Sequence, residues 1–131
     1  MYRAREKQMS IYDYLPPYHG ELCNANRWVR LAAAIDWDGF EKAYSELFAP
    51  GGKVALPARV ALGCRIIQLH YAASDREVVA LVQESPYLQY FLGFESFTDA
   101  VPFSSRTVAR FRARIPDKAV RPAVRLLRSF Q

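Results

Sequence analysis

Residues 57–71 restrict the fold more than any other segment, because apolar side chains cover most of the circumference of the helix predicted there. Pro57 fits the first turn of such a helix, where a missing amide donor costs little. A helix that is apolar nearly all round is a central, buried one, so other elements must surround it. The apolar residues concerned are Val60, Leu62, Ile66, Ile67, Leu69 and Tyr71.

Capping residues and apolar residues at helical spacing predict further helices on both sides of this segment in the sequence. No segment shows the run of alternating apolar and polar residues that is typical of a strand. We therefore expect an all-α protein, a compact bundle of about five to seven helices with a helix-turn-helix-like pair near the C-terminal end. The additional helices are predicted over residues 27–35 after Asn26, 38–48 after Asp36 or Asp38, 74–84 with the capping box of Ser74 and Glu77, 87–92 before Gly93, and 104–115.

The chain divides into three predicted parts. Residues 1–24 form an extended N-terminal arm, since Pro16 and Pro17 forbid a continuous helix there. Residues 25–115 form the helical domain, and residues 116–131 form a basic C-terminal tail or helix. Within the domain, a loop over residues 94–103 is expected to be anchored by Phe94, Phe97 and Phe103.

The helix over residues 104–115 has one apolar side and one arginine side. Val108, Phe111 and Ile115 share a side at helical spacing, and Ser104 or Ser105 can cap the first turn. A capped helix that hides three apolar residues and exposes a row of guanidinium groups suits a phosphate backbone, although a merely solvated charged face is the alternative. The row, roughly opposite the apolar side, consists of Arg106, Arg110 and Arg114.

Positive charge is concentrated in the same part of the chain. Residues 104–131 hold eight basic residues and one acidic residue, Asp117, which gives this segment a net charge of +7. Since the whole chain has a net charge of +5, residues 1–103 have a net charge of −2. Such asymmetry points to a polyanionic partner, most commonly nucleic acid. An anionic membrane surface and an acidic protein are the alternatives.

The residues needed for catalysis or for holding a metal are scattered. His19 and His70 have no partner at metal-ligand spacing, and we expect His70 to have a core or helix-end role. The acidic residues offer no set that would converge on a metal ion. We therefore predict no catalytic residue, no metal site and no cofactor.

Cysteine content and hydropathy bear on the compartment. Cys23 and Cys64 are far apart and are expected to be reduced thiols. No apolar run reaches the roughly 18 residues that a membrane-spanning helix needs, and residues 1–22 lack the apolar centre of a signal peptide. We expect a cytoplasmic protein that makes no membrane contact.

Four segments in order resemble the N-terminal domain of InsH-type insertion-sequence transposases. The run LPARVALG at residues 56–63 resembles the start of that family's central helix, and SDREVV at 74–79 resembles its next helix start. The run ESPYLQYFLG at residues 84–93 is similar to the family's Asn-Pro-Tyr-x-x-Tyr-Phe-x-Gly signature, with Ser85 in place of Asn. The arginine helix is similar to its terminal Ser-x-x-x-x-x-Arg-Phe-Arg-x-Arg helix.

The resemblance implies an all-α domain that recognises the DNA ends of the element. In that family, cutting and joining belong to a following domain with an RNase H-like fold, in which three acidic residues bind divalent metal. We expect this chain to lack that domain, as a truncated reading frame or an isolated N-terminal domain. No catalytic residue carries over, because no position here corresponds to one.

Two hypotheses of function follow. The first is a DNA-binding module, catalytically inactive alone, that recognises the terminal inverted repeats of the element as double-stranded DNA. The second is a protein-interaction module, a homodimer or a partner of full-length transposase that inhibits transposition, using an aromatic arm (Tyr12, Tyr14, Tyr18) and an amphipathic end (Val120, Val124, Leu127). For the first, the predicted DNA-binding residues are Ser105, Arg106, Thr107, Arg110, Arg112 and Arg114.

Overall fold

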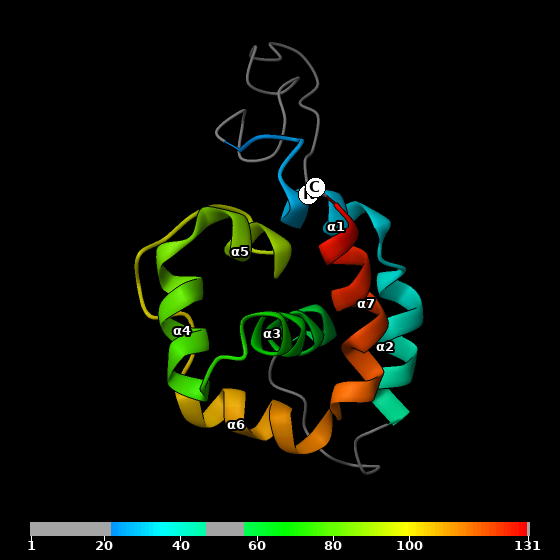
Figure 1. Ribbon diagram of the computed structural model, residues 1–131. Coiled ribbons are helices and arrows are strands. Elements are labelled where there is room, and N and C mark those ends of the chain that lie inside the picture. Colours follow the sequence, from blue (N-terminus) through cyan, green and yellow to red (C-terminus); the bar gives the residue numbers. More distant parts are fainter. Residues whose placement is uncertain (1–21, 47–56, 131) are drawn as a thin grey trace, which may run out of the picture.

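The computed structural model describes residues 22–46 and 57–130, and all regular structure in these two stretches is helical. This confirms the predicted all-α fold class. The helices enclose a common core (Figure 1). Those in the described residues are α1 (Arg27–Ala34), α2 (Trp37–Glu46), α3 (Ala58–Tyr71), α4 (Asp75–Glu84), α5 (Pro86–Phe91), α6 (Ser105–Arg114) and α7 (Asp117–Ser129).

Helix α3 is the centre of the bundle. Figure 1 looks along its axis, and α4, α6 and α7 surround it in that view. The side chains from Val60 to Gln68 are buried, which confirms that this stretch of the helix is covered on all sides. Tyr71, at its C-terminal end, is 39% exposed, so its predicted burial is wrong. A Cβ atom at Gly63 would lie 2.4 Å from the Leu92 side chain, so the glycine lets the residues after α5 approach closely. Pro57 is the N-cap residue, one position before the helix begins.

Side-chain caps begin the helices where the sequence predicts them. The Ser74 hydroxyl accepts from the Glu77 amide at 3.1 Å, and the Glu77 carboxylate accepts from the Ser74 amide at 2.7 Å, which completes the capping box. Of the two candidates for α2, Asp36 is the cap, because its carboxylate accepts from the Gly39 amide at 3.1 Å. Asn26 and Ser104 also cap their helices as predicted, whereas the cap of α5 by Ser85 was not predicted.

Gly93 ends α5, as predicted, for two physical reasons. Its φ of +93° is a conformation that side-chain-bearing residues adopt at a cost. A Cβ atom there would also lie 3.1 Å from the side chain of Arg59. Arg59 in turn donates to the carbonyl oxygens of Phe91 at 2.8 Å and Tyr90 at 3.1 Å, and it stacks over the Trp37 ring. One arginine thus joins α2, α3 and the end of α5.

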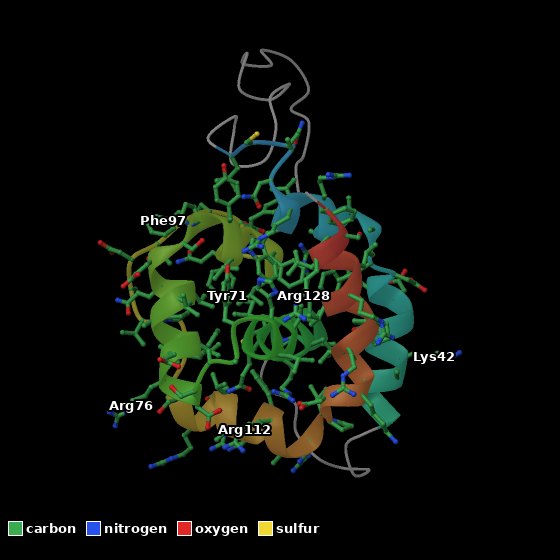
Figure 2. All side chains as sticks on the ribbon, viewed as in Figure 1. Lys42, Tyr71, Arg76, Phe97, Arg112 and Arg128 are labelled. Atoms are coloured by element: carbon green, nitrogen blue, oxygen red, sulfur yellow. The ribbon has the colours of Figure 1, made fainter. Side chains whose placement is uncertain are left out.

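The loop over residues 94–103 is held differently from the prediction. Phe94 and Phe103 do pack partly buried against the core, but Phe97 is 41% exposed and lies at the outer surface (Figure 2), so its predicted anchoring role is wrong. A buried amide fastens the loop instead. The Gln89 side chain donates to the Thr98 carbonyl at 2.8 Å and accepts from the Thr98 amide at 3.0 Å.

Replacing Gln89 by leucine is expected to lower the free energy of unfolding by about 2–3 kcal/mol, because a buried carbonyl and the loop amide lose their partner. Gln89 is fully buried and also donates to the Val82 carbonyl at 2.9 Å. Urea unfolding measures the loss. Gln83→Leu is the matched control, because the exposed side-chain amide of Gln83 donates to the Asp99 carbonyl in the same loop. This variant should lose less than about 1 kcal/mol of unfolding free energy. Equal losses of unfolding free energy in the two variants would contradict the role of Gln89 as the loop anchor.

Helix α7 packs in the same core as the other helices. Val120, Val124 and Leu127 are at most 2% exposed and face α3 and α1. Of the predicted alternatives for the C-terminal segment, a tail or a helix, the structure shows a helix over residues 117–129, which continues through Pro122. Because those three side chains are buried, a partner protein would have to use other residues.

The predicted division into arm, domain and tail stays a prediction. Residues 1–21 of the arm, including its tyrosines, lie outside the described residues; Leu22, near its end, is buried. None of the helices in the described part of the chain has the length and apolar character needed to cross a bilayer.

Candidate nucleic-acid interface

The apolar side of α6 is buried, as its spacing predicts. Val108 and Ile115 are fully buried and Phe111 is 7% exposed, and the helix packs on α3 and α4. The Ser104 hydroxyl accepts from the Thr107 amide at 3.2 Å and caps the first turn. With one side fixed in this way, the rotation of the helix about its axis is determined.

All four predicted arginines of α6 are exposed, and three of them form the row opposite the buried side. Arg106, Arg110 and Arg114 are exposed, as their position opposite Val108 requires. Among the described residues, no acidic side chain forms an ion pair with Arg106 or Arg110. Their guanidinium groups are therefore available to phosphate oxygens, which such groups bind in a two-pronged geometry.

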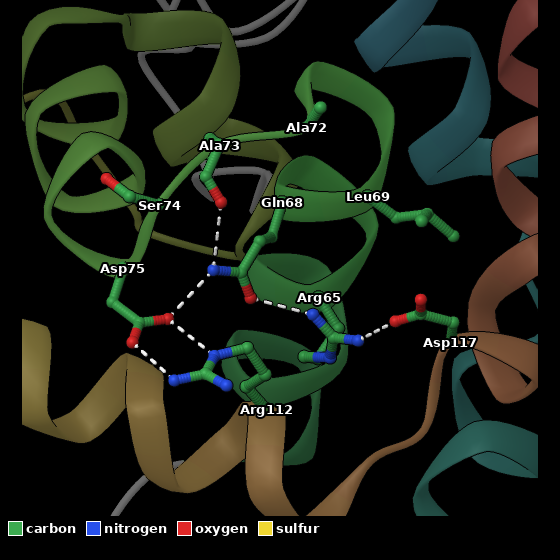
Figure 3. Close-up of a pocket in the computed structure, with 9 residues that line it drawn as sticks. All are labelled: Arg65, Gln68, Leu69, Ala72, Ala73, Ser74, Asp75, Arg112 and Asp117. Atoms are coloured by element: carbon green, nitrogen blue, oxygen red, sulfur yellow. Dashed lines mark hydrogen bonds and ion pairs between the residues drawn. The ribbon is translucent and has the colours of Figure 1, made fainter.

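Arg112 occupies a different position from the other arginines. At 100° per residue it lies only about 40° around the helix from Val108, at the edge of the buried side. Its guanidinium donates to both oxygens of Asp75, Nε to Oδ1 at 3.0 Å and Nη2 to Oδ2 at 2.9 Å. Figures 2 and 3 show the side chain of Arg112 between α6 and the start of α4. Its predicted DNA contact stays a prediction, and the structure gives it a second role as a clamp between these helices.

The two hydroxyl residues at the start of α6 are half-buried. Thr107 Oγ1 lies 3.2 Å from Ser104 Oγ, so its hydroxyl belongs to the cap of the helix. Ser105 follows the cap directly. Both stand at the helix end where backbone amides and hydroxyls commonly contact phosphate, and their contact with DNA stays a prediction.

A polar network beneath α6, with a buried centre and exposed ends, was not predicted from the sequence. Arg65 of α3 is only 3% exposed, and its Nε donates to the Ile115 carbonyl at 2.9 Å. Its other nitrogens donate to Gln68 at 2.7 Å and to Asp117, with which it forms an ion pair. Gln68 donates in turn to Asp75 at 2.8 Å. The signal in the sequence is the pair of polar residues Arg65 and Gln68 in the middle of a predominantly apolar central helix.

This network joins four helices and lines a cavity of about 390 Å³. Figure 3 shows it as a continuous chain of hydrogen bonds from Arg112 to Asp117. It holds the C-terminal end of α6 at two points, the side chain of Arg112 through Asp75 and the backbone carbonyl of Ile115 through Arg65. It also neutralises Asp117, the single acid among residues 104–131. The outer surface of this segment therefore keeps its positive charge.

The Arg112–Asp75 pair is expected to make the stability of the fold fall in acid. Hydrogen bonds from Arg112 hold the pKa of Asp75 below its ordinary value. A carboxyl with a lowered folded-state pKa stabilises the protein above its unfolded pKa, and this stabilisation is lost as the pH falls through the folded value. Urea unfolding between pH 7 and pH 3 should show a smaller loss for Asp75→Asn than for the wild type. The matched control is Asp99→Asn, on an exposed loop, which should follow the wild-type curve. Parallel curves for all three proteins would contradict this role of Asp75.

His70 lies at the last turn of α3, which confirms a helix-end position. Its ring lies edge-on to Trp28, with centroids 5.8 Å apart, and Arg128 donates to its backbone carbonyl at 3.3 Å. Burial, followed by the charges of Arg27 and Arg128, lowers its pKa. A histidine packed against Trp28 and contacted by Arg128 suits a structural role. In the described ranges, 22–46 and 57–130, no three His, Cys, Asp or Glu residues come together as a metal site would require.

Comparison with known proteins gives one family. Residues 11–114 match the family described as Transposase domain (DUF772). A protein of Rhizobium meliloti, "Uncharacterized protein ORF8 in nfe locus", is 37% identical over 87 residues, which make up 66% of this chain and 42% of that protein. The chain therefore spans less than half the length of this relative. No solved structure matches. The matched residues include α1 to α6 and most of the chain, so the protein belongs to the transposase domain (DUF772) family.

Proposed function

We propose that this chain is a DNA-binding module of an insertion-sequence transposase, of the InsH type, that recognises the terminal inverted repeats of its element. The exposed arginine row of α6 carries this proposal. Arg106, Arg110 and Arg114 project from a helix whose other side is fixed in the core, in a segment whose single acid is neutralised from within. Several exposed guanidinium groups on one fixed helix can neutralise several phosphates of a duplex at once.

The packing of α6 on α4 supports a helix-turn-helix-like use of these two helices. Such proteins place the second helix of the pair in the major groove and lay the first across the backbone. Here α4 and α6 pack directly on one another and are clamped by Asp75 and Arg112. The intervening α5 and its loop make the connection longer than in compact helix-turn-helix domains. In this arrangement α6 is the recognition helix, and Ser105 and Thr107 stand at its N-terminal end.

Catalysis is assigned to a separate part of the transposase. We propose that the chain alone neither cuts nor joins DNA, because its arginine face can bind a phosphate backbone but supplies no group to activate water. A nuclease assay with magnesium and with manganese tests this. Metal-dependent cleavage of supercoiled or end-labelled DNA by the purified chain would contradict it.

Titration against labelled duplex DNA tests the binding function. One duplex carries the end of the element and the other a scrambled sequence of the same composition, and both are measured over a range of salt. If three or four phosphates are neutralised, the logarithm of the binding constant should fall with the logarithm of salt at a slope of about −3 to −4. Preference for the element end establishes end recognition. Absence of binding to both duplexes would contradict the proposal and would favour a protein partner for the arginine face.

A further inference from the structure

Helix α7 exposes a second basic row that the proposed function does not use. Lys118, Arg121 and Arg125 are all exposed, and at 100° per residue they lie within about 60° of one another around the helix. The row lies away from Val120 and Leu127, which bury the opposite side of the helix against α3.

The charges of this row have the same sign and are closely spaced. Arg121 and Arg125 are four residues apart, and Lys118 and Arg121 are three apart, which are the spacings at which like charges on a helix repel. The single acid of α7, Asp117, is occupied by Arg65. Across the described residues, no carboxylate forms an ion pair with any of the three. A bound polyanion would relieve this repulsion, because it supplies several negative charges at once.

The two basic rows point in different directions. Helices α6 and α7 are consecutive and meet at Pro116, and both bury their apolar sides against α3. In Figure 1, α6 runs below α3 and α7 runs beside it, so their outer surfaces face away from the core on two sides of one corner. The residues that match the transposase family end at 114, before α7 begins. The comparison therefore assigns nothing to the second row.

We propose that Lys118, Arg121 and Arg125 form a second phosphate-binding surface for duplex DNA, separate from the arginine row of α6. This inference rests on the proposed function, because it takes duplex DNA as the partner of the chain. The phosphates belong either to the flank of the duplex held by α6 or to a second duplex. In either case the surface adds electrostatic affinity without reading the sequence, because phosphate contacts position a protein and base contacts specify the site.

The test replaces Lys118, Arg121 and Arg125 together by alanine in the full chain. If both rows bind, the wild-type salt slope for the element end should be about −5 to −6, steeper than the −3 to −4 expected from α6 alone. In the α7 variant the slope should become shallower by about 2 to 3, while the preference for the end over the scrambled duplex is retained. Arg121→Lys with Arg125→Lys is the matched control, since it keeps the charges and should keep the slope. A glutamine triple variant repeats the measurement if the alanine variant fails to fold by circular dichroism.

The outcomes separate this inference from the proposed function. A wild-type slope and affinity in a folded α7 variant, when the corresponding α6 variant has lost binding, would overturn the inference and leave the proposed function standing. Failure of the wild type to bind either duplex would overturn both.

A further pair of measurements identifies the source of the phosphates. Removing the base pairs that flank the end sequence should abolish the effect of the α7 substitutions if the flank is the source. Two differently labelled duplexes should appear in one complex if a second duplex is the source.

Discussion

A chain in which Arg106, Arg110 and Arg114 are replaced by alanine is expected to keep its fold and to lose most of its affinity for DNA. The three side chains are exposed, and alanine is the best helix former, so the stability should stay within about 0.5 kcal/mol of the wild type. Three phosphate contacts of about 1 kcal/mol each correspond to a loss of roughly 100-fold in affinity. The salt slope should become shallower by about 2 to 3.

Replacing the same three arginines by lysine separates two roles of the row. Lysine keeps the charge but not the planar, two-pronged guanidinium that binds the edge of guanine. If the row contacts only phosphates, the lysine variant should keep both its slope and its preference for the element end. If the row also contacts bases, the slope should persist while the preference falls. Wild-type binding by the folded alanine variant would show that α6 does not contact DNA.

Replacing Arg65 by methionine is expected to lower the free energy of unfolding by about 2–4 kcal/mol. Methionine retains much of the buried stem but leaves the Ile115 carbonyl and the Gln68 side-chain oxygen without their donor, which is the main cost. The half-exposed Asp117 also loses its counter-charge, which water partly replaces. Arg65→Lys should recover part of the loss, because an ammonium group cannot reach three acceptors in the directions that the guanidinium does. Urea unfolding monitored by circular dichroism measures each change.

The matched control is Arg76→Met, on the exposed first turn of α4 (Figure 2), which should change stability by no more than about 0.5 kcal/mol. The Arg65 variant should also bind DNA less well than its remaining folded fraction predicts, since Arg65 ties the end of α6 to the core. A loss of stability below 1 kcal/mol would mean that water replaces the guanidinium in the cavity, and that the network does not hold α6.

The helices and their caps were predictable because they depend on nearby residues. The capping box of Ser74 and Glu77 and the buried side of α6 both follow from spacings of three or four positions. The burial of α3 followed from its composition alone. The same periodicity could have shown that Arg112 does not belong to the row of Arg106, Arg110 and Arg114, since its angle around α6 is closer to that of Val108.

The partners of polar residues could not be predicted, because they join segments that are distant in sequence. Arg112 lies 37 positions from Asp75, and Arg65 lies 52 positions from Asp117. The loop anchor shows the same limit: aromatic composition favoured Phe97, whereas a buried amide, Gln89, holds the loop. Membership of a hydrogen-bond network depends on three-dimensional proximity, which no local spacing encodes.

By itself, the sequence determined that this chain is an all-α bundle around α3 and that its C-terminal segment is basic, because periodicity and charge are properties of the chain before it folds. Only the tertiary structure decided which of these charges are paired. It did so by pairing Arg112 with Asp75 and Asp117 with Arg65, since burying α6 and α7 against α3 brings those groups within hydrogen-bonding distance. Arg112 and Asp117 are still half exposed, but each is held by a partner, whereas Arg106 and Arg110 form no ion pair among the described residues.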